Sequence, residues 1–181
     1  MHQIRIHGRG GQGVVTAAEL IAIAAFYDKK VSQAFPSFGV ERTGAPIEAY
    51  ARIDDKLIRT REQIYQPNII IVLDATLLST VDVTKGADKK TLLIINTTKD
   101  KKSLNLNLPE KNIFLVDATK IALATIGKNI VNTVILGAFS KATNLVSLEG
   151  LKKAIKQKFL NKGQDIINKN INAINQAYKK L

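Results

Sequence analysis

Three continuous runs of aliphatic residues occupy the middle of the chain. They are Asn68–Asp74 (NIIIVLD), Thr91–Asn96 (TLLIIN) and Ile113–Asp117 (IFLVD). A strand that is covered on both faces does not need to alternate apolar and polar residues, and parallel sheets contain such strands. The three runs therefore predict neighbouring strands of a parallel sheet with other elements packed on both of its faces.

The first third of the chain shows a different hydrophobic pattern. Gln3–Gly8 and Ile47–Ile53 alternate apolar with polar or small residues, and Val31–Phe35 is a shorter run of the same kind. A period of two residues is typical of strands whose faces meet different surroundings. After the turn that follows Ile53, we expect Leu57–Arg61 to pair back on the preceding strand.

Helical patterns separate and follow these strands. Val14–Tyr27 is apolar on nearly every side, which predicts a helix buried by the sheet on one side and by a partner on another. Four later stretches also predict helices: Ala118–Ile126, Asn132–Thr143, Ser147–Phe159 and Asp165–Lys179. Ser147 is a suitable N-cap for the third of these helices. The polar, lysine-rich segment Lys99–Asn112 predicts a surface loop.

The order of these elements predicts the fold class. Strands that alternate with helices are typical of α/β domains, in which helices cover the sheet. We predict an open three-layer α/β fold with a mostly parallel sheet and a helical C-terminal tail. A length of 181 residues suits one domain, residues 1–181, with an α/β core at 1–131 and the tail at 132–181.

Composition excludes several classes of chemistry. The chain has no cysteine, so it supplies no thiolate to zinc or to an iron–sulfur cluster and has no cysteine nucleophile. With His2 and His7 as its only histidines, we expect no metal site. The N-terminal sequence has no apolar signal region and no apolar run is long enough to span a bilayer, so we expect a cytoplasmic protein without membrane contacts.

The charge of the chain is unevenly distributed. The formal net charge is +12, and residues 151–181 hold eight lysines against the single acid Asp165. Such a segment attracts anionic partners, or it is a solvated helix face. Phe159 and Tyr178 are the only aromatic residues near these lysines, which does not favour a platform for base stacking. We therefore expect a solvated face and no nucleic-acid partner.

A glycine loop follows the first predicted strand. Residues 8–13 read Gly-Arg-Gly-Gly-Gln-Gly, and Gly8, Gly10 and Gly13 satisfy G-x-G-x-x-G before a helix. The N–H groups at a helix start favour an anion, and glycines let a ligand approach the backbone. The glycines can equally serve close packing of the turn. The candidate binding residues here are Gly8, Gly10, Gly11, Gln12 and Gly13.

The sequence gives little support for a dinucleotide site or for catalytic groups. A dinucleotide site needs an acid at the tip of the second strand, and none follows Val31–Phe35. Asp74 and Asp117 end two aliphatic runs, where they lie at the ligand edge of a parallel sheet or cap the next helix. We favour capping. The chain contains no hydrolase or P-loop pattern, and we predict no catalytic residue in it.

A second loop, QAFPSFGVERTGAP, combines aromatic, glycine and charged residues. We expect Phe35 and Phe38 to be buried in the core or in a partner. Arg42 is a candidate clamp for a carboxylate or a phosphate, or it pairs with the neighbouring Glu41. Both readings of Arg42 remain open at this point.

The two loops together resemble a known family. GRGGQGVVTAAELIA followed by QAFPSFGVERTGAPIEAYARID is similar to the gamma subunit, or fused gamma domain, of pyruvate and related 2-oxoacid:ferredoxin oxidoreductases. PNIIIVLD, VDATKIA and NTVILGAFSKATNLVSLEGLKKAI agree with it, so the resemblance covers essentially the whole chain. Many members carry a second arginine at the position of Thr43, which weakens the case for a paired-arginine clamp in this chain.

The resemblance implies a subunit of an enzyme that converts a 2-oxoacid and coenzyme A to an acyl-CoA and passes electrons to ferredoxin. Thiamine diphosphate, Mg and 4Fe-4S clusters then belong to the alpha, beta and delta partner subunits. It also implies that this lobe handles coenzyme A through the glycine loop, with Ser37 and Arg42 as further candidates. Pyruvate is the favoured substrate, with indolepyruvate, 2-oxoglutarate and branched-chain 2-oxoacids as alternatives. A stand-alone dinucleotide-binding domain is the other reading.

Overall fold

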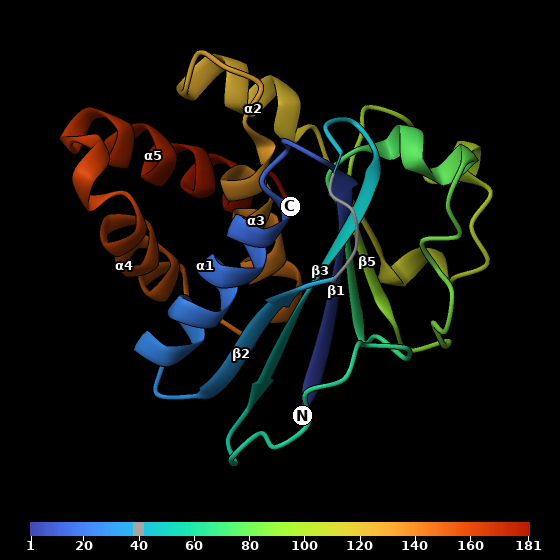
Figure 1. Ribbon diagram of the computed structural model, residues 1–181. Coiled ribbons are helices and arrows are strands. Elements are labelled where there is room, and N and C mark those ends of the chain that lie inside the picture. The colour runs from blue at the N-terminus through green and yellow to red at the C-terminus, as the bar shows by residue number, and fades with distance from the viewer. Residues whose placement is uncertain (38–41) are drawn as a thin grey trace.

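One six-stranded sheet organises the molecule. The computed structural model describes residues 1–37 and 42–181 (Figure 1). The strands lie in the order β2-β3-β1-β4-β5-β6. Their bounds are β1 (His2–Arg9), β2 (Val31–Pro36), β3 (Pro46–Asp54), β4 (Ile69–Val72), β5 (Leu92–Asn96) and β6 (Ile113–Val116). Every strand predicted from the hydrophobic pattern is confirmed except the one at Leu57–Arg61.

The sheet is mixed, with a parallel part and an antiparallel part. β1, β4, β5 and β6 pair in parallel, in agreement with the continuous aliphatic runs of the last three. β3 is antiparallel to both of its neighbours, β1 and β2. The prediction of an α/β fold with a mostly parallel sheet is confirmed, with β3 as the exception among the described strands.

The segment Leu57–Arg61 is not a strand, so that prediction is wrong. The buried Arg52 side chain on β3 explains the difference, because it donates to the carbonyl oxygens of Thr60 at 3.4 Å and of Glu62 at 2.5 Å. The carbonyls that a ladder would use are therefore held by a guanidinium. Residues 57–62 form an irregular segment that is bonded to the Arg52 side chain.

All five predicted α-helices are present. They are α1 (Val14–Tyr27), α2 (Ala118–Thr125), α3 (Val131–Thr143), α4 (Leu148–Lys158) and α5 (Gln164–Lys180). Ser147 caps α4, as predicted, because its hydroxyl accepts from Gly150 N at 2.8 Å. The helix α1 packs between the sheet and α4, so a second helix of the same chain covers the side for which we expected a partner.

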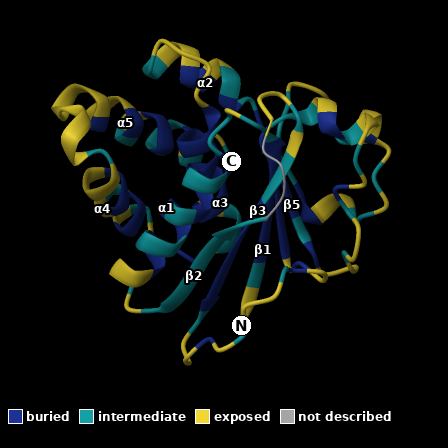
Figure 2. Cartoon of the chain, viewed as in Figure 1, coloured by how far each residue is buried: buried dark blue, intermediate teal, exposed yellow. Residues whose placement is uncertain are grey.

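The two faces of the sheet are covered differently. The α-helices lie on one face and form the larger core, in which α3 is buried along most of its length (Figures 1 and 2). The other face carries a smaller core covered by loops and by the 3-10 turns η1 (Ala75–Ser79), η2 (Lys102–Leu104) and η3 (Glu110–Asn112). The third layer is thus made of short turns.

The prediction of a surface loop at Lys99–Asn112 is partly wrong, because turns in this segment cover the second face of the sheet. Leu104 is 9% exposed and Asn112 is 8% exposed, and Leu104 belongs to the smaller core.

Within the described residues, no helix combines the length and the apolar character that a membrane span requires.

The parallel strands bring distant segments to one edge of the sheet. The glycine loop follows β1, Asp74 follows β4, Thr97 follows β5 and Asp117 follows β6. The residues that precede β3 reach the same edge, because β3 runs antiparallel to β1 and Pro46 pairs with Arg9. The carboxyl edge of a parallel sheet is where α/β proteins bind ligands.

Candidate ligand site at the carboxyl edge of the sheet

Three glycines of the loop are required by close packing inside the protein. A Cβ at Gly8 would lie 2.6 Å from Val14 Cγ2, and one at Gly10 would collide with the carbonyl oxygen of Arg42. Gly13 has a φ of 75°, and a Cβ there would collide with the side chain of Asn132. The structure therefore gives the three glycines of the G-x-G-x-x-G pattern a packing role.

Gly11 differs from the other three glycines. It is exposed, its φ is 92°, and the nearest atom to a Cβ built on it is Thr43 Cγ2 at 4.0 Å. Its backbone conformation suits glycine, while the space above it is open. Gly13 caps α1 without a side chain, so the first-turn N–H groups of α1 receive no side-chain cap. Such N–H groups favour an anion.

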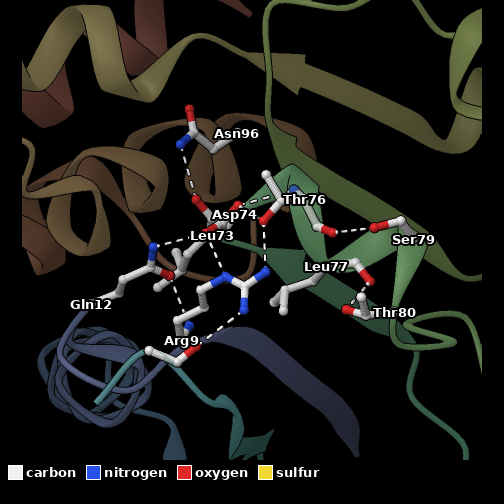
Figure 3. Close-up of polar contacts among 10 residues, drawn as sticks. Arg9, Gln12, Leu73, Asp74, Thr76, Leu77, Ser79, Thr80 and Asn96 are labelled. Carbon is white, nitrogen blue, oxygen red and sulfur yellow. Dashed lines mark hydrogen bonds and ion pairs between the residues drawn. The ribbon is translucent and has the colours of Figure 1, made fainter.

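The side chain of Gln12 folds the glycine loop back onto the sheet. Its Oε1 accepts from Arg9 N at 2.8 Å, and its Nε2 donates to Asp74 Oδ2 at 3.1 Å (Figure 3). Both ends of the amide are therefore used within the protein. Gln12, a candidate ligand residue, is thus a brace between the loop and the end of β4, and it also lines a cleft at this edge of the sheet.

Arg9 completes this brace. Its Nε lies 3.1 Å from Asp74 Oδ2, and its two terminal nitrogens donate to Gly44 O at 3.1 Å and Thr76 Oγ1 at 2.9 Å (Figure 3). One guanidinium thus joins the glycine loop, the segment that precedes β3 and the turn after β4. This arrangement fixes the edge of the site from three directions.

Asp74 is the common acceptor of the brace. As predicted, it caps the following turn, because its Oδ1 accepts from Thr76 N at 3.0 Å. Burial by itself raises the pKa of Asp74, but the hydrogen bonds from Thr76 and Gln12 and the charge of Arg9 outweigh it and leave this pKa lowered. Asp74 is therefore ionised near neutral pH, and its carboxylate accepts from both the Arg9 guanidinium and the Gln12 amide.

The two sequence motifs are joined directly. Gly10 N donates to Ala45 O at 2.9 Å, and Gly44 N donates to Gly10 O at 3.0 Å, so that residues 43–45 run beside the glycine loop. Arg42 is exposed next to Gly10. The structure thus places the Arg42 backbone beside the glycine loop. The predicted pairing with Glu41 lies outside the described residues.

The structure places Ser37 elsewhere. Its N–H donates to Glu48 O at 3.0 Å, and its hydroxyl accepts from Gln63 Nε2 at 3.5 Å, on the face of the sheet that carries Tyr50. Phe35 lies on that face too, with its ring centroid 5.2 Å from that of Tyr50, and it is half-buried where we expected burial. Phe38, for which we also expected burial, lies outside the described residues.

A cleft of about 850 Å³ lies at the same edge of the sheet, beside the brace. Gln12 and Asp74 form one wall, and the turns after β5 and β6 form the others, with Asn96, Lys99, Asp117 and Lys120 among the lining residues. Asp117 also caps α2, as predicted, because it accepts from Lys120 N at 2.8 Å. The volume is sufficient for a ligand of drug size or larger.

Sequence reasoning missed most of this cleft. Asn96 is held in place by donating to Leu73 O at 2.9 Å and to Thr119 Oγ1 at 3.0 Å. Lys99 and Lys120 contribute two cations to the lining. Their signal in the sequence is position, because each follows a buried strand of the parallel sheet by a few residues.

Comparison with known proteins decides the family. A profile described as pyruvate ferredoxin/flavodoxin oxidoreductase matches residues 3–180. The chain belongs to this family. The resemblance inferred from the two loop motifs is confirmed.

Relatives from archaea and bacteria agree with this assignment. The chain is 54% identical over 156 residues to pyruvate synthase subunit PorC of Methanosarcina barkeri, covering 86% of this chain and 85% of the relative. It is 50% identical to the pyruvate/ketoisovalerate oxidoreductases common subunit gamma of Pyrococcus abyssi, covering 99% and 97%. The crystal structure of pyruvate oxidoreductase subunit PORC from Thermotoga maritima superposes with a TM-score of 0.83 at 36% identity, covering 98% and 95%.

The residues of this chain do not fit an iron–sulfur cluster. The sequence holds no cysteine that could ligate an iron–sulfur cluster. In the part of the chain that the structure describes, no three histidine, aspartate or glutamate residues are grouped as metal ligands. What this edge of the sheet offers is an open glycine, an arginine, two lysines and a cleft, which are features of a binding site.

Proposed function

We propose that this chain is the gamma subunit of a multi-subunit pyruvate, or related 2-oxoacid, ferredoxin oxidoreductase and holds coenzyme A for the acyl transfer. The relatives named as pyruvate synthase subunit PorC and as a common subunit gamma support the first part. The relative in Pyrococcus abyssi is common to pyruvate and ketoisovalerate oxidoreductases. A subunit shared in this way leaves the choice of 2-oxoacid to other subunits.

One observation carries the coenzyme A assignment. An exposed positive-φ glycine, Gly11, and the exposed Arg42 lie together at the start of α1, whose N-cap offers no side chain. Coenzyme A carries a pyrophosphate and a phosphate monoester, and backbone N–H groups and a guanidinium suit both. In the proposed site Gly11 and Arg42 contact phosphate. The residues that shape the loop are Gly8, Gly10, Gln12 and Gly13. Ser37 is the first residue of the β2–β3 connection, which contains Arg42.

The adjacent cleft supports the same ligand. Lys99 and Lys120 lie among its lining residues, and the apolar side chains of Leu123 and Val131 face it as well. A nucleotide with a long organic arm needs both cationic and apolar contacts along its length. The cleft and the glycine loop share the Gln12–Asp74 brace, so one extended ligand can reach both.

The remaining parts of the enzyme are assigned to partners. A chain without cysteine supplies no thiolate to a 4Fe-4S cluster. We assign the clusters, thiamine diphosphate and Mg to alpha, beta and delta subunits, with ferredoxin reached through the complex in the cytoplasm.

Affinity purification of the tagged chain from its native host tests this assignment. Recovery of thiamine-bearing and cluster-bearing subunits supports it, and a chain that purifies alone at native levels contradicts it.

The glycine loop is tested by Gly11→Val in the reconstituted complex. We expect a raised apparent Michaelis constant for coenzyme A with an unchanged constant for the 2-oxoacid, since the branched side chain fills the open space above Gly11. Gly163→Val is the matched control, because Gly163 has a φ of 91° with no atom within 4 Å of a Cβ and precedes α5. A Gly11→Val complex that assembles with an unaltered constant contradicts the proposed site.

The stand-alone dinucleotide reading predicts a different result. A purified dinucleotide-binding domain would bind NAD(H) or NADP(H) by itself. Isothermal titration calorimetry of the chain with each nucleotide and with coenzyme A separates the two readings. We expect heat only with coenzyme A.

A further inference from the structure

A polar cluster lies on the face of the sheet opposite α1, within the antiparallel part. Its members are Arg5 and His7 on β1 and Glu48 and Tyr50 on β3. Arg5, His7 and Tyr50 are 5%, 2% and 2% exposed, while the Glu48 side chain is 32% exposed. The register places His7 opposite Glu48 and Arg5 opposite Tyr50. A cluster of this kind in a sheet centre needs a reason, because burying polar groups is costly.

Glu48 is the acid around which His7 and Tyr50 are arranged. Arg5 Nε donates to His7 Nε2 at 3.1 Å, which places the imidazole proton on Nδ1, 3.4 Å from Glu48 Oε1. Tyr50 donates its hydroxyl proton to Glu48 Oε2 at 2.7 Å. Burial lowers the pKa of His7 to about 4, so the imidazole is neutral near pH 7 and acts as a fixed donor. Glu48 Oε2 thus accepts a hydrogen bond from Tyr50, and Oε1 lies near the imidazole of His7.

Arg5 fixes the other side of the cluster. It donates to the carbonyl oxygens of Val83 at 3.1 Å and of Lys85 at 2.6 Å. The segment that contains these carbonyls covers the sheet beside His7. The chain of donors from Arg5 through His7 to Glu48 is therefore anchored at one end in the buried face of the sheet.

Glu48 lies where the two ends of the β2–β3 connection meet. Ser37 N donates to Glu48 O at 3.0 Å at one end, and Glu48 follows Pro46 by two residues at the other. Residues 43–45, just before Pro46, pair with Gly10. Glu48 is thus tied to Ser37 at one end of the β2–β3 connection, and the glycine loop holds residues 43–45, which follow Arg42, at the other end.

We infer that Glu48 is a positioning residue, oriented by His7 and Tyr50. It fixes the two ends of the β2–β3 connection, Ser37 and residues 43–45, and thereby presents Arg42 to the phosphates of the ligand. This inference rests on the proposed function in one respect only, the ligand role of Arg42. The positioning of residues 43–45 by Glu48 can be measured without any ligand.

The first test measures amide exchange in the complete chain. In Tyr50→Phe and in Glu48→Gln we expect the Gly44 and Ala45 amides to exchange about tenfold faster, since one hydrogen bond to a charged acceptor is lost or weakened. The Leu151 amide, bonded to Ser147 O in α4, serves as the internal reference. Tyr65→Phe is the matched control, because Tyr65 is 67% exposed. Unaltered exchange at Gly44 and Ala45 in a folded Tyr50→Phe chain overturns the inference.

The second test measures the Michaelis constant for coenzyme A in the reconstituted complex. We expect Tyr50→Phe to raise it about threefold to tenfold with little effect on kcat, and to have no further effect in an Arg42→Ala background. An Arg42→Ala complex with an unaltered constant contradicts the ligand role of Arg42, and the exchange test then decides the positioning role. Additive effects of the two substitutions show that Tyr50 does not act through Arg42 and overturn the inference.

Discussion

Gln12 Nε2 donates to Asp74 Oδ2 at 3.1 Å across a separation of 62 residues. The same carboxylate receives Arg9 Nε at the same distance, so two side chains of the glycine loop meet one acid at the end of β4. The loop is therefore held in its shape before any ligand arrives. A binding loop that is already ordered loses less conformational entropy on binding.

Asp74→Asn should loosen the loop and destabilise the chain. The ion pair with Arg9 is lost and one donor of the asparagine amide faces Gln12 Nε2, so we expect the free energy of unfolding at pH 7 to fall by about 1–3 kcal/mol. Urea unfolding followed by circular dichroism gives the value.

The effect of Asp74→Asn should depend on pH with a definite sign. The folded-state pKa of Asp74 is lowered, so its contribution is present above the pKa of the unfolded chain, about 3.9, and is lost as the pH falls through the folded-state value. Wild type and variant should converge below pH 4. A constant difference down to pH 3 would show that the carboxylate charge is not what stabilises the loop.

Gly10→Ala tests the packing role of the loop glycines. The added Cβ collides with the Arg42 carbonyl, which is backbone and cannot rotate away. We expect a loss of about 1–3 kcal/mol in the free energy of unfolding and faster exchange of the Gly44 amide, whose acceptor is Gly10 O. Wild-type stability together with wild-type exchange at Gly44 would argue against close pairing of the two motifs.

His7 should make the stability of the chain fall between pH 6.5 and pH 4. Its pKa is about 4 in the folded protein and about 6.5 when unfolded, so the unfolded chain binds the proton first as the pH decreases. From pH 7 to pH 4.5 the wild type should lose about 2–3 kcal/mol more than His7→Gln. Urea unfolding of both proteins at the two pH values measures this difference. Equal losses in the two proteins would contradict a neutral, buried His7.

Asn132 offers a test of a buried polar group beside the site. It is 6% exposed, its Nδ2 donates to Gly13 O at 3.3 Å, and its Oδ1 has no hydrogen-bond partner within the described part of the chain. Asn132→Leu keeps the volume and removes the unpaired oxygen, so we expect a change within about 1 kcal/mol. Asn132→Asp buries a charge and should cost about 3 kcal/mol. Thermal unfolding of both variants gives the comparison, and equal losses would contradict this account.

Local sequence pattern was sufficient for most of the elements. The strand at Asn68–Asp74 and the helix at Val14–Tyr27 were predicted from the hydrophobic pattern of residues that are close along the chain. The caps formed by Asp74, Asp117 and Ser147 were predicted for the same reason, since a cap bonds to an N–H two or three residues away. Interactions between residues so close along the chain can be predicted from the local sequence.

The site was predictable only in part. The two loop motifs indicated an anion site, and the structure brings the two motifs side by side, with the Arg42 backbone at Gly10. The sequence did not show that Gln12 would be used by Arg9 and Asp74, or that Ser37 would bond to Glu48 and Gln63. Except for Arg9, each of these partners lies well outside the local stretch of sequence around Gln12 or Ser37.

The sequence by itself determined the elements, their caps, the absence of thiolate chemistry and the family. Only the tertiary structure decided which glycines pack and which one is open, that short turns and two arginines cover the second face, and which acid the glycine loop uses. Helical and strand periods depend on neighbours along the chain, whereas the partner of a buried polar group depends on which strands become neighbours. That choice is made by packing of the whole sheet.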